Sequence, residues 1–210
     1  SFGGLERGGW SFAFEYAGWA YMVDSRSGNA ARVGRVSVDK YDDPSAAIEV
    51  REYYQTSSSF SAPLSGGCYA GNGWGVFVGK TGGWALRAGL DDFLNSDVVN
   101  YDWTNSNYQD WSTSCFSNGD DYVYIMPTYY NNYNLVKIPL LHFNTYSHIY
   151  LGQSSYGGYS ESFSDGDGYQ YLVPWGQDYH TGGDRNHGTL VRFQLSTEAV
   201  STWDLKSVDS

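Results

Sequence analysis

The chain contains four copies of one sequence pattern, and this internal repeat constrains its fold more than any other feature. One segment reads GYQYLVP at residues 168–174 and DYVYIMP at 121–127, with weaker copies GWGVFV at 73–78 and GWAYMV at 18–23. A period of this length is typical of proteins built from stacked supersecondary units. The leading aromatic residues, which lie 55, 48 and 47 residues apart, are Trp19, Trp74, Tyr122 and Tyr169.

A second segment of the repeat places a basic residue at one fixed position. It reads VGRVSV at 33–38, ALRAGL at 85–90, LVKIPL at 135–140 and LVRFQL at 190–195. One interpretation is a ring of cations with a binding role. We favour a structural role, in which each side chain pairs with a carbonyl or an acidic residue on a neighbouring repeat. The four residues are Arg35, Arg87, Lys137 and Arg192.

The repeats have the composition and the patterning of short β-strands. The chain contains 20 Tyr, 10 Phe, 8 Trp and 26 Gly, and aromatic residues suit half-buried strands while Gly marks turns. Apolar and polar residues alternate over short runs, and no segment shows a capped helical period. About four short strands per repeat predict an all-β fold, a four-repeat β-propeller with antiparallel strands in each blade.

We expect a single propeller domain over residues 1–210, with repeats at about 19–73, 74–121, 122–168 and 169–210. The segment 1–18 holds a strand introduced by Gly8-Gly9, which matches Gly157-Gly158. We expect this strand to complete the last blade and so to remove the exposed edges. The alternative is an open arc, or one part of a larger ring that other copies complete.

The fourth repeat is the most complete copy. It reads SFSDG at 162–166, GYQYLVP at 168–174, NHGTLVRF at 186–193 and WDL at 203–205. It resembles tandem repeats of the type F-x-D-G, Y-x-Y-x-V-P and H-G-K-V-x-R-F, found in secreted, mostly uncharacterised proteins of algae, oomycetes and related protists. The resemblance implies an extracellular propeller-like repeat and implies no chemistry. The third repeat lacks the His-Gly pair, and the first two repeats are degenerate.

The run Asp165-Gly166-Asp167-Gly168 has two interpretations. Asp165 and Asp167 could supply carboxylates to Ca²⁺, which binds six to eight oxygen ligands. The corresponding segments of the other repeats keep Gly with Asn or Asp but do not keep the carboxylates. We therefore favour a structural turn over a calcium site, and otherwise expect no cofactor.

Cys68 and Cys115 are the two cysteines of the chain, and they occupy similar positions in adjacent repeats. Such positions lie close together in neighbouring blades, so an intrachain disulfide is expected. The alternatives are two free buried thiols or a bridge between molecules.

Aromatic residues also gather in the loops between the expected strands. Rigid aromatic side chains stack on sugars and anchor protein interfaces. The loop TYYNNYN at 128–134 is too polar for a core. We therefore expect contacts with partners at Tyr108, Trp111, Tyr129, Tyr130, Tyr133, Trp175 and Tyr179.

No catalytic residues are predicted from the sequence. The chain has no G-x-S-x-G segment and no P-loop. Adjacent acidic pairs such as Asp91-Asp92 point to opposite faces of a strand and cannot act together as acid and base. We therefore expect a protein that is not an enzyme.

The charge of the chain limits its partners. Twelve Lys and Arg against 23 Asp and Glu give a net charge of −11, which disfavours nucleic acid as a partner. The chain has no apolar run long enough to predict membrane insertion. Two cysteines and abundant Tyr, Ser and Gly fit a secreted protein. We expect an extracellular structural or interaction protein that associates with itself or with other extracellular proteins. The alternatives are a carbohydrate-binding propeller and, third, an enzyme that acts on glycans.

Overall fold

The computed structural model describes residues 9–25, 30–40, 43, 49–54, 63–80, 83–93, 95–100, 112–119, 121–127, 134–152, 158–174 and 189–205. In these regions the chain is all-β, with sixteen strands and one short 3-10 helix, η1 (Val38–Lys40). No helix in this part of the chain has the length and apolar character needed to cross a membrane.

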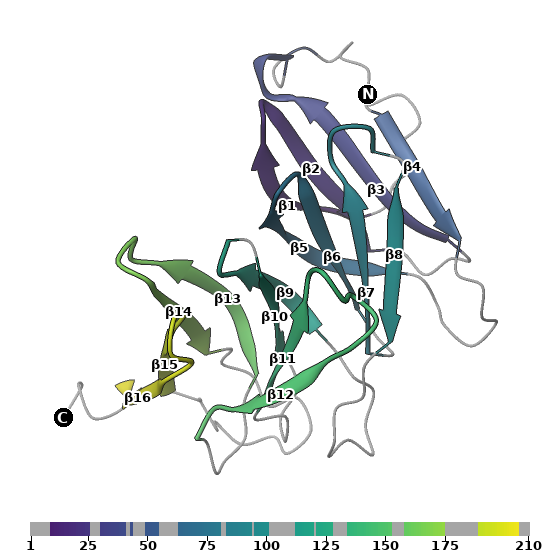
Figure 1. Cartoon of the computed structure of the whole chain (residues 1–210). Coiled ribbons are helices and arrows are strands. Elements are labelled where there is room, and N and C mark those ends of the chain that lie inside the picture. Colours follow the sequence, from purple (N-terminus) through teal and green to yellow (C-terminus); the bar gives the residue numbers. More distant parts are fainter. Residues whose placement is uncertain are drawn as a thin grey trace, which may run out of the picture.

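The strands form four antiparallel sheets of four strands, each in chain order, as Figure 1 shows. The strands of blade 1 are β1 (Trp10–Tyr16), β2 (Trp19–Asp24), β3 (Ala30–Ser37) and β4 (Glu49–Tyr54). The strands of blade 2 are β5 (Leu64–Gly71), β6 (Trp74–Gly79), β7 (Trp84–Gly89) and β8 (Ser96–Asn100).

The second half of the chain repeats this arrangement. The strands of blade 3 are β9 (Ser112–Ser117), β10 (Tyr122–Pro127), β11 (Asn134–Pro139) and β12 (Ser147–Tyr150). The strands of blade 4 are β13 (Tyr159–Ser164), β14 (Tyr169–Pro174), β15 (Thr189–Gln194) and β16 (Val200–Asp204). The expected four-blade propeller architecture is therefore confirmed.

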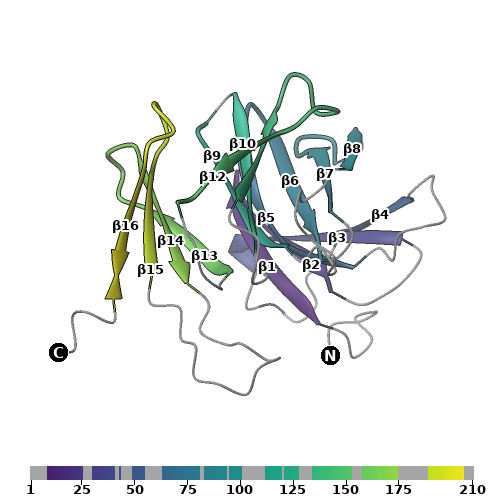
Figure 2. The same ribbon diagram turned by 90° about the horizontal axis from the view of Figure 1, so that it is seen from below.

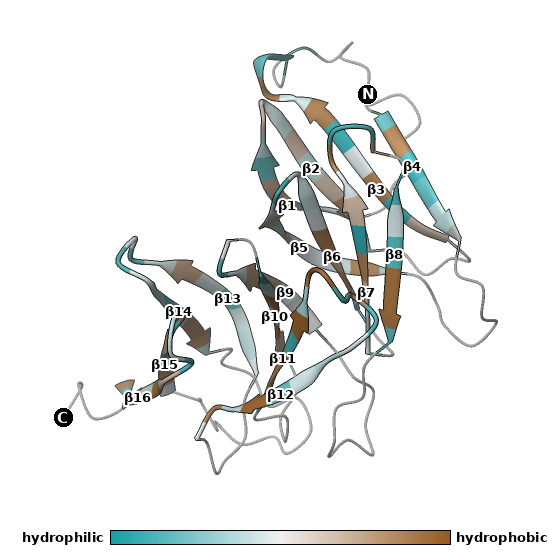
Figure 3. Cartoon of the chain, viewed as in Figure 1, coloured by the Kyte–Doolittle hydropathy of each residue, from teal (hydrophilic) through white to brown (hydrophobic). Residues whose placement is uncertain are grey.

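Each blade packs on the next through apolar side chains. The middle strands of a blade therefore bury side chains on both faces. On β10, Val123 and Ile125 pack against blade 2, while Tyr124 and Met126 pack against blade 4. Figure 3 shows apolar residues on middle strands such as β6 and β10. We call the face of a blade that points to the next blade in the chain its forward face, and the opposite face its backward face.

One detail of the predicted topology is wrong. The strand β1 pairs with β2 and belongs to blade 1, and it does not complete the last blade as the Gly8-Gly9 match predicted. Ala17 and Gly18 connect the two strands with φ angles of 49° and 76°. A two-residue turn with positive φ at both positions forms a tight hairpin, so local pairing prevails over pairing with the distant β16.

The blades form an arc that is open between the last blade and the first. Packing joins β1 to β5, β5 to β9 and β9 to β13, and no comparable packing joins β13 to β1 in the described residues. The two views in Figures 1 and 2 show the blades following one another in chain order. The forward face of blade 4 therefore has no following blade within the chain.

Candidate functional site

The repeated basic residues connect each blade to the next. Arg35 donates a hydrogen bond of 2.9 Å from Nη1 to the carbonyl oxygen of Leu90 in blade 2, and it pairs with Glu49 of its own blade at 2.8 Å. Arg87 donates in the same way to the carbonyl oxygen of Leu140 in blade 3. Each guanidinium thus satisfies a carbonyl across a blade boundary.

Lys137 also connects its blade to the next one, but its partner is a carboxylate and not a backbone carbonyl. Its ammonium group pairs with the carboxylate of Glu198 in blade 4 and lies 3.8 Å from the ring centre of Tyr122. Arg35 and Arg87 likewise lie 4.5 Å and 4.4 Å from the rings of the leading aromatic residues in their blades. A cation placed over an aromatic face is stabilised by the ring quadrupole, which holds the side chain in position for the next blade.

Arg192, the fourth member of the series, has no such partner among the described residues. Its guanidinium lies 4.5 Å from the ring of Tyr169 and 5.1 Å from the ring of Trp203, both in blade 4. Its Nε atom is buried without a hydrogen-bond partner, and no ion pair or hydrogen bond of the Arg192 side chain is found among the described residues. The side chain lies over the ring of Tyr169, and no acceptor from a following blade is found in the described parts of the chain.

A stacked aromatic pair recurs on the forward faces of blades 1, 3 and 4. The pairs are Phe14 with Tyr21, Phe116 with Tyr124, and Phe163 with Tyr171, each with ring centres 5.1 Å apart. In each pair the first residue lies opposite the second across the first two strands of the blade.

The exposure of these pairs differs sharply between blades. Phe14 and Phe116 are 8% and 5% exposed because the next blade covers them, whereas Phe163 is 53% exposed. Trp203 on the same face is 42% exposed. Among the described residues no further blade covers this aromatic group. We call it the open face and define it by Phe163, Tyr169, Tyr171, Arg192 and Trp203.

The innermost strands form a second feature, a polar groove. It has a volume of about 650 Å³ and is bounded by β1, β5, β9 and β13. Hydroxyl groups dominate its wall, together with Glu161 and the buried amide of Gln170. Gln170 donates a 2.8 Å hydrogen bond to the hydroxyl of Ser162. We call this feature the inner groove; its serine residues include Ser11, Ser65, Ser114 and Ser160.

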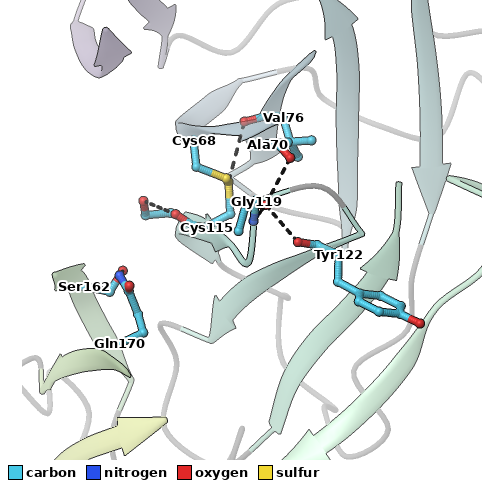
Figure 4. The surroundings of a disulfide bond; sticks show 10 residues. Cys68, Ala70, Val76, Cys115, Gly119, Tyr122, Ser162 and Gln170 are labelled. Atoms are coloured by element: carbon cyan, nitrogen blue, oxygen red, sulfur yellow. Dashed lines mark hydrogen bonds between the residues drawn. A yellow bond between two sulfur atoms is a disulfide. The ribbon is translucent and has the colours of Figure 1, made fainter. Parts of the chain in front are cut away.

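A disulfide between Cys68 of β5 and Cys115 of β9 joins blades 2 and 3 beside the inner groove (Figure 4). The Cα atoms of the two residues are 5.5 Å apart. The expected intrachain bond is therefore present, and neither cysteine is free. Figure 4 also shows Ser162 and Gln170 of blade 4.

The Asp165–Asp167 segment has the geometry of a turn. The carboxylate of Asp165 accepts hydrogen bonds from the backbone N–H groups of Asp167 and Tyr169 at 2.8 Å and 3.2 Å. Gly166 and Gly168 have φ angles of 83° and 88°, which favour glycine. The carboxylate of Asp165 is thus engaged by the backbone.

Blade 3 builds the same turn with an amide in place of the carboxylate. Asn118 accepts from the N–H groups of Asp121 and Tyr122 through its side-chain oxygen. In both turns a glycine N–H donates to a serine hydroxyl, from Gly119 in blade 3 and Gly166 in blade 4. Among the described residues no group of three or more His, Cys, Asp or Glu could hold a metal ion.

The loop aromatics that the sequence suggested as contact residues lie outside the described residues. They are Tyr108, Trp111, Tyr129, Tyr130, Tyr133, Trp175 and Tyr179. The open face was not among the predicted sites. The sequence does carry a phenylalanine at the same blade position in three repeats, as Phe14, Phe116 and Phe163. This equivalence can be recognised only from the strand register, which places each phenylalanine opposite the corresponding tyrosine.

Comparisons with known proteins identify the fold. No protein-family model matches the chain, and no curated protein matches its sequence. Among solved structures, the chain is similar to a streptogramin B lyase, with a TM-score of 0.59, 13% identity and coverage of 88% of this chain and 51% of the lyase. It is also similar to a catalytically inactive virginiamycin B lyase from Staphylococcus aureus with quinupristin, with a TM-score of 0.63 and 12% identity. That match covers 94% of this chain and 55% of the lyase.

These similarities establish a β-propeller-like fold, and the chain spans about half the length of the lyases that it matches. They also correct one prediction. The expectation that the chain is not an enzyme is contradicted, because the streptogramin B and virginiamycin B lyases that it resembles in fold are enzymes. The absence of familiar sequence motifs was a weak basis for that expectation, since a fold hosts many chemistries and activity depends on a few placed side chains.

Proposed function

We propose that this chain is an interaction protein, an arc of propeller blades that assembles with another chain through its open face. The observation that carries this proposal is the Phe163–Tyr171 pair. Equivalent pairs in blades 1 and 3 are covered by the next blade, whereas Phe163 remains 53% exposed. Burying aromatic surface of this kind contributes about 25 cal/mol per Å² of apolar area.

An extracellular setting fits the same features. The Cys68–Cys115 disulfide forms readily in oxidising compartments. The resemblance of the fourth repeat to tandem repeats of secreted protist proteins supports the same location. Repeats of that kind occur in tandem. This is consistent with an arc whose last blade packs against further blades.

Sedimentation of the purified chain over a wide concentration range tests assembly. We expect association of the native chain, and we expect Tyr171→Lys to abolish it, because a buried ammonium group has no partner in the covered face. Leu141→Lys is the matched control, since Leu141 is 85% exposed and lies in a turn after β11. A native chain that stays monomeric at every concentration would contradict the proposal, and so would association that Tyr171→Lys leaves unchanged.

The inner groove favours a second function, the binding of a carbohydrate. Hydroxyl groups, one carboxylate (Glu161) and the oriented amide of Gln170 supply the donors and acceptors that sugar hydroxyls require. A glycan array tests this function. Binding that Gln170→Leu removes and Leu141→Lys preserves would support it, while an array without signal at high protein concentration would oppose it.

A further inference from the structure

The boundary between blades 3 and 4 differs from the two boundaries before it in how the repeated basic residue is used. At the first boundary the carbonyl oxygen of Leu90 accepts from Nη1 of Arg35 at 2.9 Å and from the hydroxyl of Tyr21 at 3.2 Å. At the second boundary the carbonyl oxygen of Leu140 accepts from Arg87. In both cases a guanidinium satisfies a backbone carbonyl of the next blade.

Leu195 is the residue of blade 4 that corresponds to Leu90 and Leu140. Each of the three residues follows the basic residue of its own blade by three positions. The N–H group of Leu195 donates to Gly168 at 2.9 Å, as that of Leu90 donates to Gly73 at 2.8 Å. Because the backbone is held in the same way, the carbonyl group of Leu195 faces the preceding blade, as that of Leu90 does.

The donors of blade 3 are directed to a carboxylate instead of this carbonyl. Lys137 pairs with Glu198, and the hydroxyl of Tyr124 donates to the same carboxylate at 3.1 Å. Glu198 occupies the position of Phe93, six residues after the basic residue of its blade, and the φ angles of the two residues are 59° and 55°. Among the described residues no donor reaches the carbonyl oxygen of Leu195.

The exchange of Arg and Phe for Lys and Glu leaves a cavity at this boundary. The guanidinium of Arg35 lies between two rings, 4.5 Å from the centre of Trp19 and 5.0 Å from that of Phe93, and Arg87 is placed in the same way. At the third boundary the corresponding residues line a cavity of about 480 Å³, a size typical of small-ligand sites. They are Tyr122, Lys137 and Glu198.

The cavity has more negative than positive charge. The carboxylates of Asp121 and Glu198 and the ammonium group of Lys137 line it, which leaves one negative charge unbalanced. Both carboxylates act on the same point, because burial together with Glu198 and Asp121 raises the pKa of the Tyr124 phenol. A ligand that fits this cavity therefore carries a positive charge and hydrogen-bond donors.

The chain itself shows which cation fits such a set of acceptors. The guanidinium of Arg35 is held by the carbonyl oxygen of Leu90 and by the carboxylate of Glu49, beside an aromatic ring. A guanidinium is planar and carries five donors, so it reaches two acceptors at once, whereas an ammonium group is a compact point charge. The cavity again offers a carbonyl group and a carboxylate, in Leu195 and Asp121.

We propose that this cavity binds a guanidinium group that comes from outside the chain. The guanidinium donates to the carbonyl oxygen of Leu195 and to the carboxylate of Asp121, while Lys137 and Tyr124 hold Glu198 in place. The site lies between two blades of one chain, so it does not depend on assembly through the open face. The two sources of such a group are a small guanidinium compound and an arginine side chain of a partner protein.

An NMR titration of the isotope-labelled native chain with N-acetylarginine amide tests the site. We expect saturable shifts of the backbone signals of Asp121 and Leu195. Binding of N-acetylcitrulline amide, in which a neutral urea group replaces the guanidinium, should be at least about tenfold weaker. Equal binding of the two amides, or no saturable shift with the arginine derivative, would overturn the proposal.

Two substitutions locate the ligand. Lys137→Arg supplies the guanidinium from within, as Arg87 does at the second boundary, so binding should be lost while the circular dichroism spectrum is unchanged. Asp121→Asn should weaken binding by about tenfold, and Asp167→Asn, which changes the net charge equally but lies outside the cavity lining, should not. Binding that Lys137→Arg and Asp121→Asn leave unchanged would overturn the proposed site.

Two further ligands distinguish the sources of the guanidinium. Methylguanidinium and a glycine-flanked arginine peptide are titrated into the native chain in the same way. Equal affinities would assign the site to small guanidinium compounds, because the head group alone is recognised. An affinity at least about tenfold higher for the peptide would assign it to an arginine side chain of a partner protein. Binding of neither ligand would contradict the proposal.

Discussion

Cys68 of β5 and Cys115 of β9 are joined by a disulfide, with their Cα atoms 5.5 Å apart, and this bond fastens blade 2 to blade 3. The residues are 47 positions apart in the chain, so the bond closes a long loop in the unfolded state. Both side chains belong to the apolar cluster between the two blades. The bond therefore reinforces the middle boundary of the arc.

Loss of this bond should lower the free energy of unfolding by about 3–4 kcal/mol, the loop-entropy contribution for a loop of this length. Urea denaturation of the native chain with and without reductant measures the effect. The variant with both Cys68→Ala and Cys115→Ala should match the reduced chain and should not respond to reductant. A reduced chain as stable as the oxidised one would show that packing alone holds blades 2 and 3 together.

Arg87 and Arg192 occupy the same repeat position but differ in what they contact. Arg87→Leu should lower the free energy of unfolding by about 2 kcal/mol, because it leaves the carbonyl group of Leu140 without its donor and removes the contacts with Trp74 and Phe143. Arg192→Leu should lower the stability of the monomer by less, about 0.5–1 kcal/mol, because it removes only the contacts with Tyr169 and Trp203.

Chemical denaturation of both variants at low protein concentration tests this contrast. Arg192→Leu should instead weaken association of the native chain, measured by sedimentation. Equal destabilisation by the two substitutions would mean that Arg192 has a partner within its own chain.

The repeat made the number and type of strands predictable, because the alternation of Val123, Tyr124, Ile125 and Met126 reports a strand buried on both faces. The paired cysteines were predictable for the same reason, since equivalent positions in adjacent repeats lie close together. The placement of β1 in blade 1 was not predictable in this way. The Ala17-Gly18 turn carries little sequence signal for a hairpin, and the match of Gly8-Gly9 with Gly157-Gly158 predicted pairing with the last blade.

The open face could not be found from sequence alone. Phe163 has the same residue type as Phe14 and Phe116, so composition does not distinguish a covered aromatic pair from an uncovered one. The difference depends on whether another blade follows in space. That is a property of the end of the arc, and no local pattern encodes it.

The turn at Asp165 needs a side-chain acceptor and does not need a charge, because Asn118 performs the same role in blade 3. Asp165→Asn should therefore leave the free energy of unfolding within about 0.5 kcal/mol of the native value, and Asp165→Ala should lower it by about 1 kcal/mol. Addition of Ca²⁺ should leave the melting temperature of all three proteins unchanged. A rise with Ca²⁺ in the native chain that is lost in Asp165→Ala would instead establish a calcium site.

Buried tyrosines should make the fold sensitive to alkaline pH. Burial raises the pKa of Tyr53 from 10.0 to about 12, and its hydroxyl group donates to the carbonyl oxygen of Phe93. Burial also raises the pKa of Tyr159, and burial together with the nearby Glu198 raises that of Tyr124. Between pH 10 and 12 the unfolded chain loses tyrosine protons that the folded chain retains, so the free energy of unfolding falls as pH rises.

Urea denaturation at a series of alkaline pH values, followed by circular dichroism, measures this slope. Tyr53→Phe removes one of the titrating groups, so its stability should fall less steeply between pH 10 and 12 than that of the native chain. Tyr159→Phe should flatten the slope in the same direction, and the double variant should flatten it further, because the two residues lie in blades 1 and 4 and titrate independently. A slope that neither substitution changes would mean that these phenols ionise at the same pH in the folded and unfolded chains.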